Sequence, residues 1–243
     1  MNNYKSLLAV SVLIAILPII PVNASSDKQD KHAKKLLDQM AATLRGTKSL
    51  DAKVELVFTK IQPKSVPIVR LSEGTLKLSK PNLASFMIRD GRYETLVSDG
   101  NFRWSMYDEA TYIKKRASPD GGNLSSLDCF LLSYFFTQNL DIFDSKKETG
   151  HALAVLYIKQ TKFQGQIVDI VEVSGEISKD GDRSSLTCYI DRDHLLRRSI
   201  LHTFHGLIHL DYDARYKNIK VNEPMKTEDF AFAPPAGSQP FKP

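Results

Sequence analysis

The chain has 243 residues, of which 42% are hydrophobic and 25% charged, and its formal net charge is +5 at pH 7. This mildly basic balance favours, at the level of a few charges, anionic lipid headgroups or acidic partners. No block of five or more like charges occurs, so the sequence lacks the tail typical of nucleic-acid binding, and we expect no nucleic-acid partner.

Residues 1–24 have the pattern of a secretory signal peptide, with Val22 and Ala24 as the small residues before a cleavage site. The apolar run is about 15 residues long and contains Pro18 and Pro21, whereas a membrane-spanning helix needs roughly 20. We expect export to the periplasm, cleavage after Ala24 and a soluble mature protein. Because the segment holds one lysine and no acid, the mature charge is +5 − 1 = +4.

The first elements of the mature chain are a predicted helix and a predicted strand. From Asp30 to Leu44 the apolar positions follow the i, i+3, i+4, i+7 rule of an amphipathic helix, which Gly46 ends. The period then changes to two over residues 50–61, which indicates a strand with one apolar face that includes Leu56 and Phe58.

Two further strands and a hairpin follow. The stretch IVRLSEGTLKLSKPNLASFMI predicts a strand pair, in which Gly74 indicates a bulge or bend and Pro81 an edge or turn. In LVSDGNFRWSMYDEA, the Asp99-Gly100 pair can supply the positive φ angles of a two-residue turn. We therefore expect the segments on either side of this turn, the second of which holds Trp104, to pair antiparallel.

Residues 124–136 return to a helical pattern. Leu127, Phe130, Leu131, Tyr134 and Phe135 form the apolar stripe, and further apolar residues widen it. A helix that is apolar over so much of its circumference must be covered on more than one side. It is therefore either sandwiched in the core or placed over a hydrophobic cavity.

The second half reads as a run of antiparallel strands, with residues 191–194 as a turn and residues 208–217 as the clearest alternation of apolar and polar positions. About nine strands in meander order predict a mainly β (α+β) fold, in which one large antiparallel sheet curls into a half-open barrel with an N-terminal helix and an inserted lid helix. Without a Pro-, Gly- or Ser-rich linker, residues 25–243 are expected to form a single domain.

Candidate chemistry is sparse. The sequence contains no G-x-S-x-G, H-E-x-x-H, C-x-x-C or Gly-rich phosphate loop, so we expect no enzyme and no cofactor. Histidines at 202, 205 and 209 precede Asp211 and Asp213, but 202 and 205 would point to opposite faces of a strand, so we expect no metal site. Cys129 and Cys188 are either a disulfide or two separate buried thiols, depending on their distance.

Three segments carry a family resemblance. The stretches SEGTLKLSKPNLASFMI, ETLVSDGNFRWSMYDEA and DFAFAPPAGS resemble, in order and spacing, the signature segments of the periplasmic outer-membrane lipoprotein carriers (LolA-like). The stretch CYIDRDHLLRRSIL resembles a predicted periplasmic, lipoprotein-sorting-like and uncharacterised branch of that superfamily. The resemblance runs from about residue 33 to 237.

The resemblance implies a half-open barrel whose cavity, under a helical lid, takes lipoprotein acyl chains. The N-terminal helix and the 124–136 helix would form the lid, and the hairpin would be part of the barrel wall, with Trp104 facing either the cavity or the packed back. In the carriers an arginine just before the Pro-Asn pair holds the lid shut by hydrogen bonds, and here Lys80 occupies that position. Lysine lacks the planar fork of arginine, so this latch would be weaker or absent.

We therefore expect a periplasmic carrier or binding protein, acting as a monomer, for lipoprotein acyl chains or another lipid-like ligand. The alternative is an envelope sensor or structural module that uses the same cup to bind a partner protein. The residues expected to line the cavity or lid, which without the resemblance would be assigned to an ordinary core, are Leu56, Phe58, Phe86, Trp104, Leu127, Phe130, Leu131, Tyr134 and Phe135.

Overall fold

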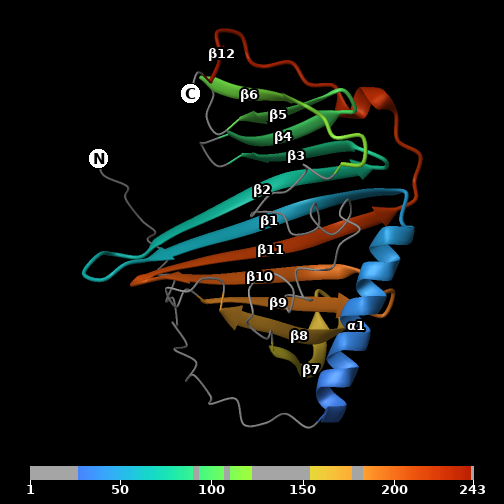
Figure 1. The fold of residues 1–243 in the computed structure, drawn as a ribbon, viewed down its shortest axis with the longest axis vertical. Helices are drawn as coiled ribbons and strands as arrows, with labels where there is room; N and C mark the ends of the chain where they lie inside the picture. The colour runs from blue at the N-terminus through green and yellow to red at the C-terminus, as the bar shows by residue number, and fades with distance from the viewer. Residues whose placement is uncertain (1–26, 90–92, 107–109, 122–153, 177–182, 242–243) are drawn as a thin grey trace, which may run out of the picture.

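The computed structural model describes residues 27–89, 93–106, 110–121, 154–176 and 183–241. Within these ranges one α-helix lies against one sheet of twelve strands (Figure 1). The strand order is β12-β6-β5-β4-β3-β2-β1-β11-β10-β9-β8-β7. Neighbouring strands pair antiparallel except β12, which pairs parallel with β6.

The helix α1 spans Asp27–Gly46. The strands of the first half are β1 (Ser49–Ile61), β2 (Ile68–Ser79), β3 (Leu83–Arg89), β4 (Tyr93–Asp99), β5 (Phe102–Met106) and β6 (Thr111–Arg116). Those of the second half are β7 (Ala154–Phe163), β8 (Gln166–Glu176), β9 (Arg183–Asp191), β10 (Leu196–His205), β11 (Ile208–Val221) and β12 (Gln239–Pro240), with the 3-10 helix η2 (Thr227–Phe230) before β12.

The topology is two meanders joined at the middle of the sheet. Strands β1 to β6 follow one another toward one edge, strands β7 to β11 return from the other, and β11 closes the sheet by pairing with β1. The expected mainly β fold is confirmed as a large, curled, open antiparallel sheet (Figure 1). It holds more strands than the nine expected, and the predicted lid helix over 124–136 lies outside the described residues.

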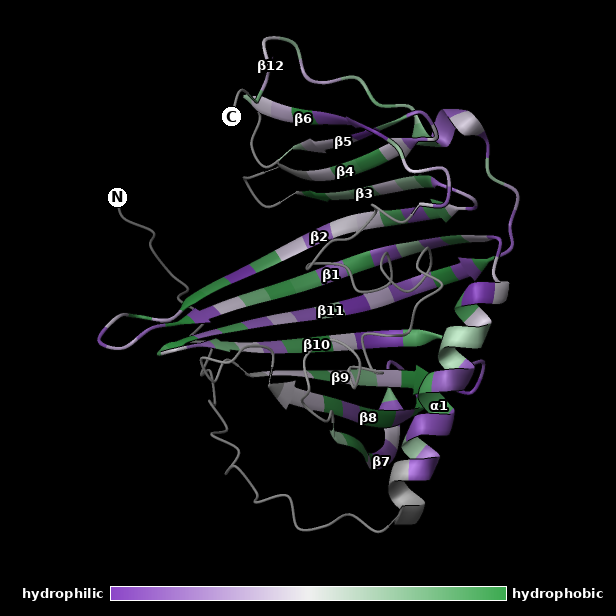
Figure 2. Ribbon diagram, viewed as in Figure 1, coloured by the Kyte–Doolittle hydropathy of each residue, from purple (hydrophilic) through white to green (hydrophobic). Residues whose placement is uncertain are grey.

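The sheet has an inner face, against which α1 packs, and an outer face. Directly paired residues share a face, so the pairs Leu56 with Ala214 and Phe86 with Leu96 define the inner one. Figure 2 shows the alternation of hydrophobic and hydrophilic residues along the strands that creates these two faces. The buried stripe of α1 that meets the inner face is Ala33, Leu36, Leu37, Met40 and Leu44.

Gly74 permits a close approach between strands and does not form the expected bulge. The pairing of β2 with β1 and β3 passes through Gly74 without a register shift. A Cβ atom at this position would lie 2.3 Å from the carbonyl oxygen of Met87 and 2.9 Å from Cγ1 of Ile88. Glycine is therefore required because β3 leaves no room for a side chain.

The hairpin between β4 and β5 forms as expected, but its turn is shifted by one residue. The two loop residues are Gly100, with φ +92°, and Asn101, whereas Asp99 ends β4. The Asp99 carboxylate accepts hydrogen bonds from the backbone amides of Asn101 (2.8 Å) and Phe102 (2.7 Å). Partial burial alone would raise the pKa of Asp99, but these hydrogen bonds outweigh it and lower the pKa.

The other predicted turns are confirmed. Pro81 lies in the turn between β2 and β3. Asp191 ends β9, and its buried carboxylate accepts hydrogen bonds from the backbone amides of Asp193 and Leu195, both at 2.9 Å, and contacts Nε of Arg197 at 2.5 Å. Across the described part of the chain, no helix has the length and apolar character needed to span a membrane.

Candidate functional site

The burial of the inner face decreases along β1 with distance from α1. Near α1, the inward side chains from Leu50 to Leu56 are buried in the main hydrophobic cluster. Past Leu56, Phe58 is only half-buried and packs on Tyr212 of β11, with ring centroids 5.1 Å apart. The same face then carries the basic residues Lys60 and Arg70, of which Arg70 pairs with Phe58. The same face is thus packed core at one end and partly accessible surface at the other.

Three of the predicted cavity residues lie on this inner face. Leu56 and Phe86 belong to the packed cluster, and Phe86 is only 2% exposed. Phe58 lies beyond the cluster, where the face becomes accessible. The register therefore places the three on one face, and Phe58 is the half-buried one among them.

Three hydroxyl groups of β10 and β11 lie among the apolar side chains of the inner face. Ser199 of β10 and the hydroxyl of Tyr216 lie 3.3 Å apart and satisfy each other inside the core. Thr203 pairs with Leu210 and so lies on the same face nearer the accessible end. Its Oγ1 is shielded from solvent and has no hydrogen-bond partner among the described residues, so it can donate to an acceptor placed there.

Lys80 connects the sheet to the end of α1. Its Nζ donates hydrogen bonds to the backbone carbonyl oxygens of Leu44 (3.1 Å) and Arg45 (2.5 Å), in the last turn of the helix. A cation at this end complements the helix dipole and satisfies carbonyl groups that have no partner within the helix. Burial lowers the pKa of Lys80. The predicted latch residue thus contacts α1, one of the two expected lid elements.

Trp104 does not share the inner face with Leu56, Phe58 and Phe86. Of the two placements expected for it, facing the cavity or facing the packed back, it takes the second. It pairs with Val97, while Leu96 of the inner face pairs with Ser105, so Trp104 projects from the outer face. There its ring packs against Phe232 at 5.9 Å and Tyr112 at 5.7 Å between centroids. Alternation in a hairpin fixes which residues share a face but not which face turns inward.

The C-terminal segment covers this part of the outer face. Phe230 at the end of η2 is fully buried, and Asp229 pairs with Lys77 of β2 at 2.7 Å. The two phenylalanines of the Phe-x-Phe-x-Pro-Pro-x-Gly signature, Phe230 and Phe232, therefore pack against the outer side of the sheet. This packing accounts for the presence of both Trp104 and the signature without any ligand.

The remaining predicted ligand residues, Leu127, Phe130, Leu131, Tyr134 and Phe135, lie outside the described residues, as does Cys129. The other cysteine, Cys188, lies on the inner side of β9 with a free, buried thiol. Burial raises the pKa of this thiol to about 12. Cys188 is therefore an inert member of the core at neutral pH.

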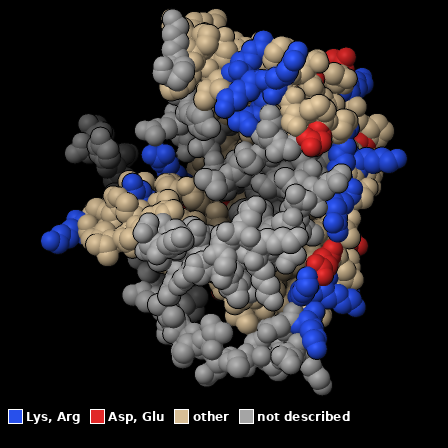
Figure 3. Space-filling model, viewed as in Figure 1, with Lys and Arg blue, Asp and Glu red and all other residues tan. Residues whose placement is uncertain are grey.

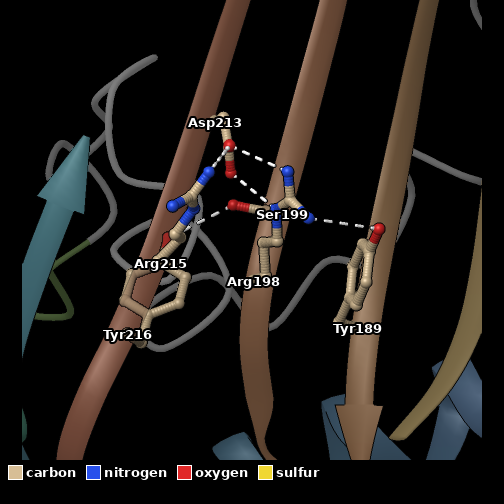
Figure 4. A network of polar contacts seen from close by, with 6 residues as sticks. All are labelled: Tyr189, Arg198, Ser199, Asp213, Arg215 and Tyr216. Atoms are coloured by element: carbon tan, nitrogen blue, oxygen red, sulfur yellow. Dashed lines mark hydrogen bonds and ion pairs between the residues drawn. The ribbon is translucent and has the colours of Figure 1, made fainter. Parts of the chain in front are cut away.

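The outer face of β9, β10 and β11 carries a polar network (Figure 4). Arg198 donates to both oxygens of Asp213, at 2.7 and 2.8 Å, and also to the hydroxyl of Tyr189 at 3.3 Å. Arg215 donates to Asp213 from the other side at 2.9 Å. Burial would lower the pKa of Arg198, but the hydrogen bonds and charge of Asp213 raise it. Asp213 is thus paired with two arginines, while Nε of Arg215 is buried without a hydrogen-bond partner among the described residues.

A His-Asp cluster lies on the same face nearer the β10–β11 turn. His202 Nδ1 and His209 Nε2 lie 2.5 and 2.7 Å from the same oxygen, Oδ1 of Asp211. The possible ligand atoms of these three side chains lie within 4.8 Å of one another, so they could supply three ligands to a divalent metal such as zinc. The sequence reasoning compared His202 with His205 and missed the pair that the two-residue turn at Gly206 brings together.

A family model described as "Predicted periplasmic protein (DUF2092)" matches residues 33–242, which is most of the chain. The chain belongs to the DUF2092 family. This assignment agrees with the uncharacterised, predicted periplasmic branch expected from the sequence. No curated protein matches the chain.

The DUF2092 chain is also similar to solved structures. Lipoprotein LppX of Mycobacterium tuberculosis is 12% identical, with 82% of this chain and 99% of that one covered and a TM-score of 0.44. A LolA superfamily protein of Nitrosomonas europaea is 9% identical, with coverages of 82% and 97% and a TM-score of 0.37. A putative outer-membrane lipoprotein-sorting protein domain of Vibrio parahaemolyticus is 10% identical, with coverages of 83% and 97% and a TM-score of 0.32.

Proposed function

We propose that this DUF2092 protein is a periplasmic binding protein or carrier that holds the acyl chains of a lipoprotein or another lipid against the inner face of its sheet. The observation that carries the proposal is the continuity of that face, from the cluster under α1 to the half-buried Phe58 and Tyr212. Each methylene removed from water contributes about 0.8 kcal/mol, so a few acyl chains on such a surface suffice for tight binding.

In this proposal α1 and the ligand compete for apolar surface. The stripe of α1 from Ala33 to Leu44 occupies part of the inner face, and Lys80 holds the last turn of the helix against the sheet. A ligand that displaces an apolar helix gains only the difference between the two burial free energies, which makes binding reversible. The segment 124–136 is proposed as the second lid element on its sequence pattern alone.

Thr203 supports a ligand with a polar acceptor next to its hydrocarbon. Its Oγ1 is shielded from solvent, has no hydrogen-bond partner among the described residues, and lies on the inner face beside Leu210. An ester or amide carbonyl, as found where an acyl chain joins a lipid or lipoprotein, is an acceptor of this kind. A plain hydrocarbon would leave the hydroxyl without a partner.

The first test is extraction of the protein from its native envelope with organic solvent, followed by mass spectrometry. Acylated molecules bound in a defined ratio to the protein are the expected result. A clean extract together with a co-purifying protein would favour the alternative, an envelope sensor or structural module. Because no catalytic motif occurs in the sequence, we propose a function without catalysis.

The second test compares neighbours on opposite faces of β1. Phe58 and Val57 are both half-buried, but only Phe58 lies on the inner face. In an assay with a fluorescent fatty acid, Phe58→Glu is expected to weaken binding at least about tenfold, because it places a charge in the acyl site. Val57→Glu, checked for folding by circular dichroism, should bind like the parent. Equal effects of the two variants would contradict the proposal.

A further inference from the structure

Two hairpins extend together beyond the rest of the sheet. Because β1 pairs with both β2 and β11, the loop between β1 and β2 lies beside the turn between β10 and β11. Strand β3 pairs with β2 only from Glu73 onward, so residues 68–72 of β2 have no paired strand on that side among the described residues. Figure 1 shows the resulting projection at the end of the molecule opposite α1. We call residues 60–71 and 204–209 the hairpin tip.

The hairpin tip carries several large apolar side chains that are exposed to solvent. Val66 in the first loop is 86% exposed and Leu207 in the second turn is 80% exposed. Along the flanking strands Leu71 is 68% exposed, and Ile68, Val69 and Phe204 are also exposed. Most of the large exposed hydrophobic side chains of the described residues are thus concentrated here, and a contiguous cluster of this kind marks an interaction site.

The charges of the hairpin tip have one sign. Lys60, Lys64 and Arg70 surround the apolar side chains, and the sequence holds no acidic residue between Glu55 and Glu73 or from 204 to 210. Figure 3 shows basic and uncharged side chains, and no acidic ones, on the visible surface of this projection. The partner must therefore combine negative charge with a place for apolar side chains.

An anionic lipid bilayer has both properties. We infer that the hairpin tip docks on an anionic membrane surface, with Val66 and Leu207 entering the headgroup region and Lys60, Lys64 and Arg70 binding lipid phosphates. Short apolar side chains with flanking cations are what interfacial membrane binding uses. The unpaired edge of residues 68–72 limits the depth, because backbone polar groups without partners stay where water can reach them.

A second copy of the chain fits this surface less well. Two hairpin tips placed against each other would bring together six basic side chains, three from each copy, without an acid to neutralise them. The proposal goes beyond the function proposed above, because membrane insertion is assigned to Val66 and Leu207 in the two loops, and acyl binding to Phe58 and its neighbours on the inner face. The two can therefore be tested separately.

The experiment is vesicle flotation of the mature chain, residues 25–243. Vesicles of phosphatidylcholine with about one third phosphatidylglycerol should carry the protein to the top of the gradient, and pure phosphatidylcholine should not. Val66→Asp with Leu207→Asp is expected to reduce the bound fraction at least about tenfold. The matched control is Ile158→Asp, because Ile158 is also exposed (47%) but lies on β7 at the far edge of the sheet.

Two double variants that reverse charges test the electrostatic part of the proposal, in which basic side chains bind lipid phosphates. Lys64→Glu with Arg70→Glu should abolish flotation, because each cation near an anionic surface contributes about a fivefold gain in binding and the acids add repulsion. Lys34→Glu with Lys35→Glu changes the net charge equally on α1 and should change flotation far less.

Three results would overturn the inference. One is equal binding to neutral and anionic vesicles, the second is equal loss in the tip variants and their controls, and the third is an oligomer in light scattering that Val66→Asp with Leu207→Asp converts to monomer. Binding of a fluorescent fatty acid in vesicle-free solution, measured on Val66→Asp with Leu207→Asp, should be unchanged, because both residues lie in the loops of the hairpin tip and not on the inner face. If this variant lost fatty-acid binding but still floated with anionic vesicles, the membrane-docking inference would fail. The function proposed above would not be contradicted by that result.

Discussion

The two ends of β1 have the same sequence pattern and different environments. At the end near α1 the inward side chains are buried beneath a helix whose last turn is held by Lys80. At the other end the same face carries Phe58, which is only half-buried, and Ile68 of β2, which is exposed. The difference shows that the alternation of a strand creates an apolar face, while the cover placed over that face decides whether it becomes core or a binding surface.

The largest expected effect compares leucines at the two ends. Leu44 of α1 is fully buried, and Leu44→Ala is expected to lower the free energy of unfolding by about 2–5 kcal/mol, because it leaves a cavity in the core. Leu207→Ala at the hairpin tip should change it by less than about 0.5 kcal/mol. Urea denaturation followed by circular dichroism measures both. A similar cost for the two would show that the hairpin tip is part of the stable core.

The second prediction concerns the close approach of β2 and β3. Gly74→Ala is expected to cost about 1–3 kcal/mol, because the new methyl group would overlap the carbonyl of Met87 and force the strands apart. Gly46→Ala is the control, since no atom lies within 4 Å of a Cβ placed at that position. Thermal unfolding of both variants distinguishes steric overlap from the general effect of replacing glycine, which would appear in the control as well.

The third prediction is a pH dependence from Cys188 in the covered part of the sheet. Its pKa of about 12 in the folded state exceeds the value near 9 of an unfolded thiol, so above pH 9 the folded state holds one proton more. Stability should therefore fall as the pH rises from 9 toward 12, by at most about 1.4 kcal/mol per pH unit. The urea concentration at the unfolding midpoint, measured at pH 8, 9 and 10 under reducing conditions, should fall less steeply with pH in Cys188→Ala than in the parent protein. Parallel curves for the two proteins would mean that the thiol is in contact with solvent in the folded state.

The smallest expected effect concerns the contact between Lys80 and α1. Lys80→Met removes two hydrogen bonds to the last turn of the helix and should cost about 1 kcal/mol, while Lys80→Arg should restore most of it. Lys35→Met, at an exposed position of α1, is the control. Hydrogen exchange of the amides near the end of α1 gives a sharper readout, since faster exchange is expected only in Lys80→Met. No change there would mean that packing alone holds the helix.

The candidate site shows where sequence reasoning succeeded and where it stopped. Phe58 was correctly placed beside Leu56 on an apolar face, because both follow from the period of two. Trp104 was grouped with them because the alternation of a hairpin does not tell which of its two faces turns inward. Only the packing of Phe230 and Phe232 on the side of Trp104 identifies that side as the outer face. His202 and His209 were not joined, because their proximity depends on the length of the turn at Gly206.

The sequence by itself determined the helix, the strands, most of the turns and the family, because these depend on local periodicity, on glycine and proline chemistry and on short motifs. Only the tertiary structure decided which face of the sheet is covered, where Lys80 binds and which apolar residues stay exposed at the hairpin tip. The physical reason is that burial depends on contacts between segments far apart in the chain, and a strand's pattern is the same whether another element covers it or not.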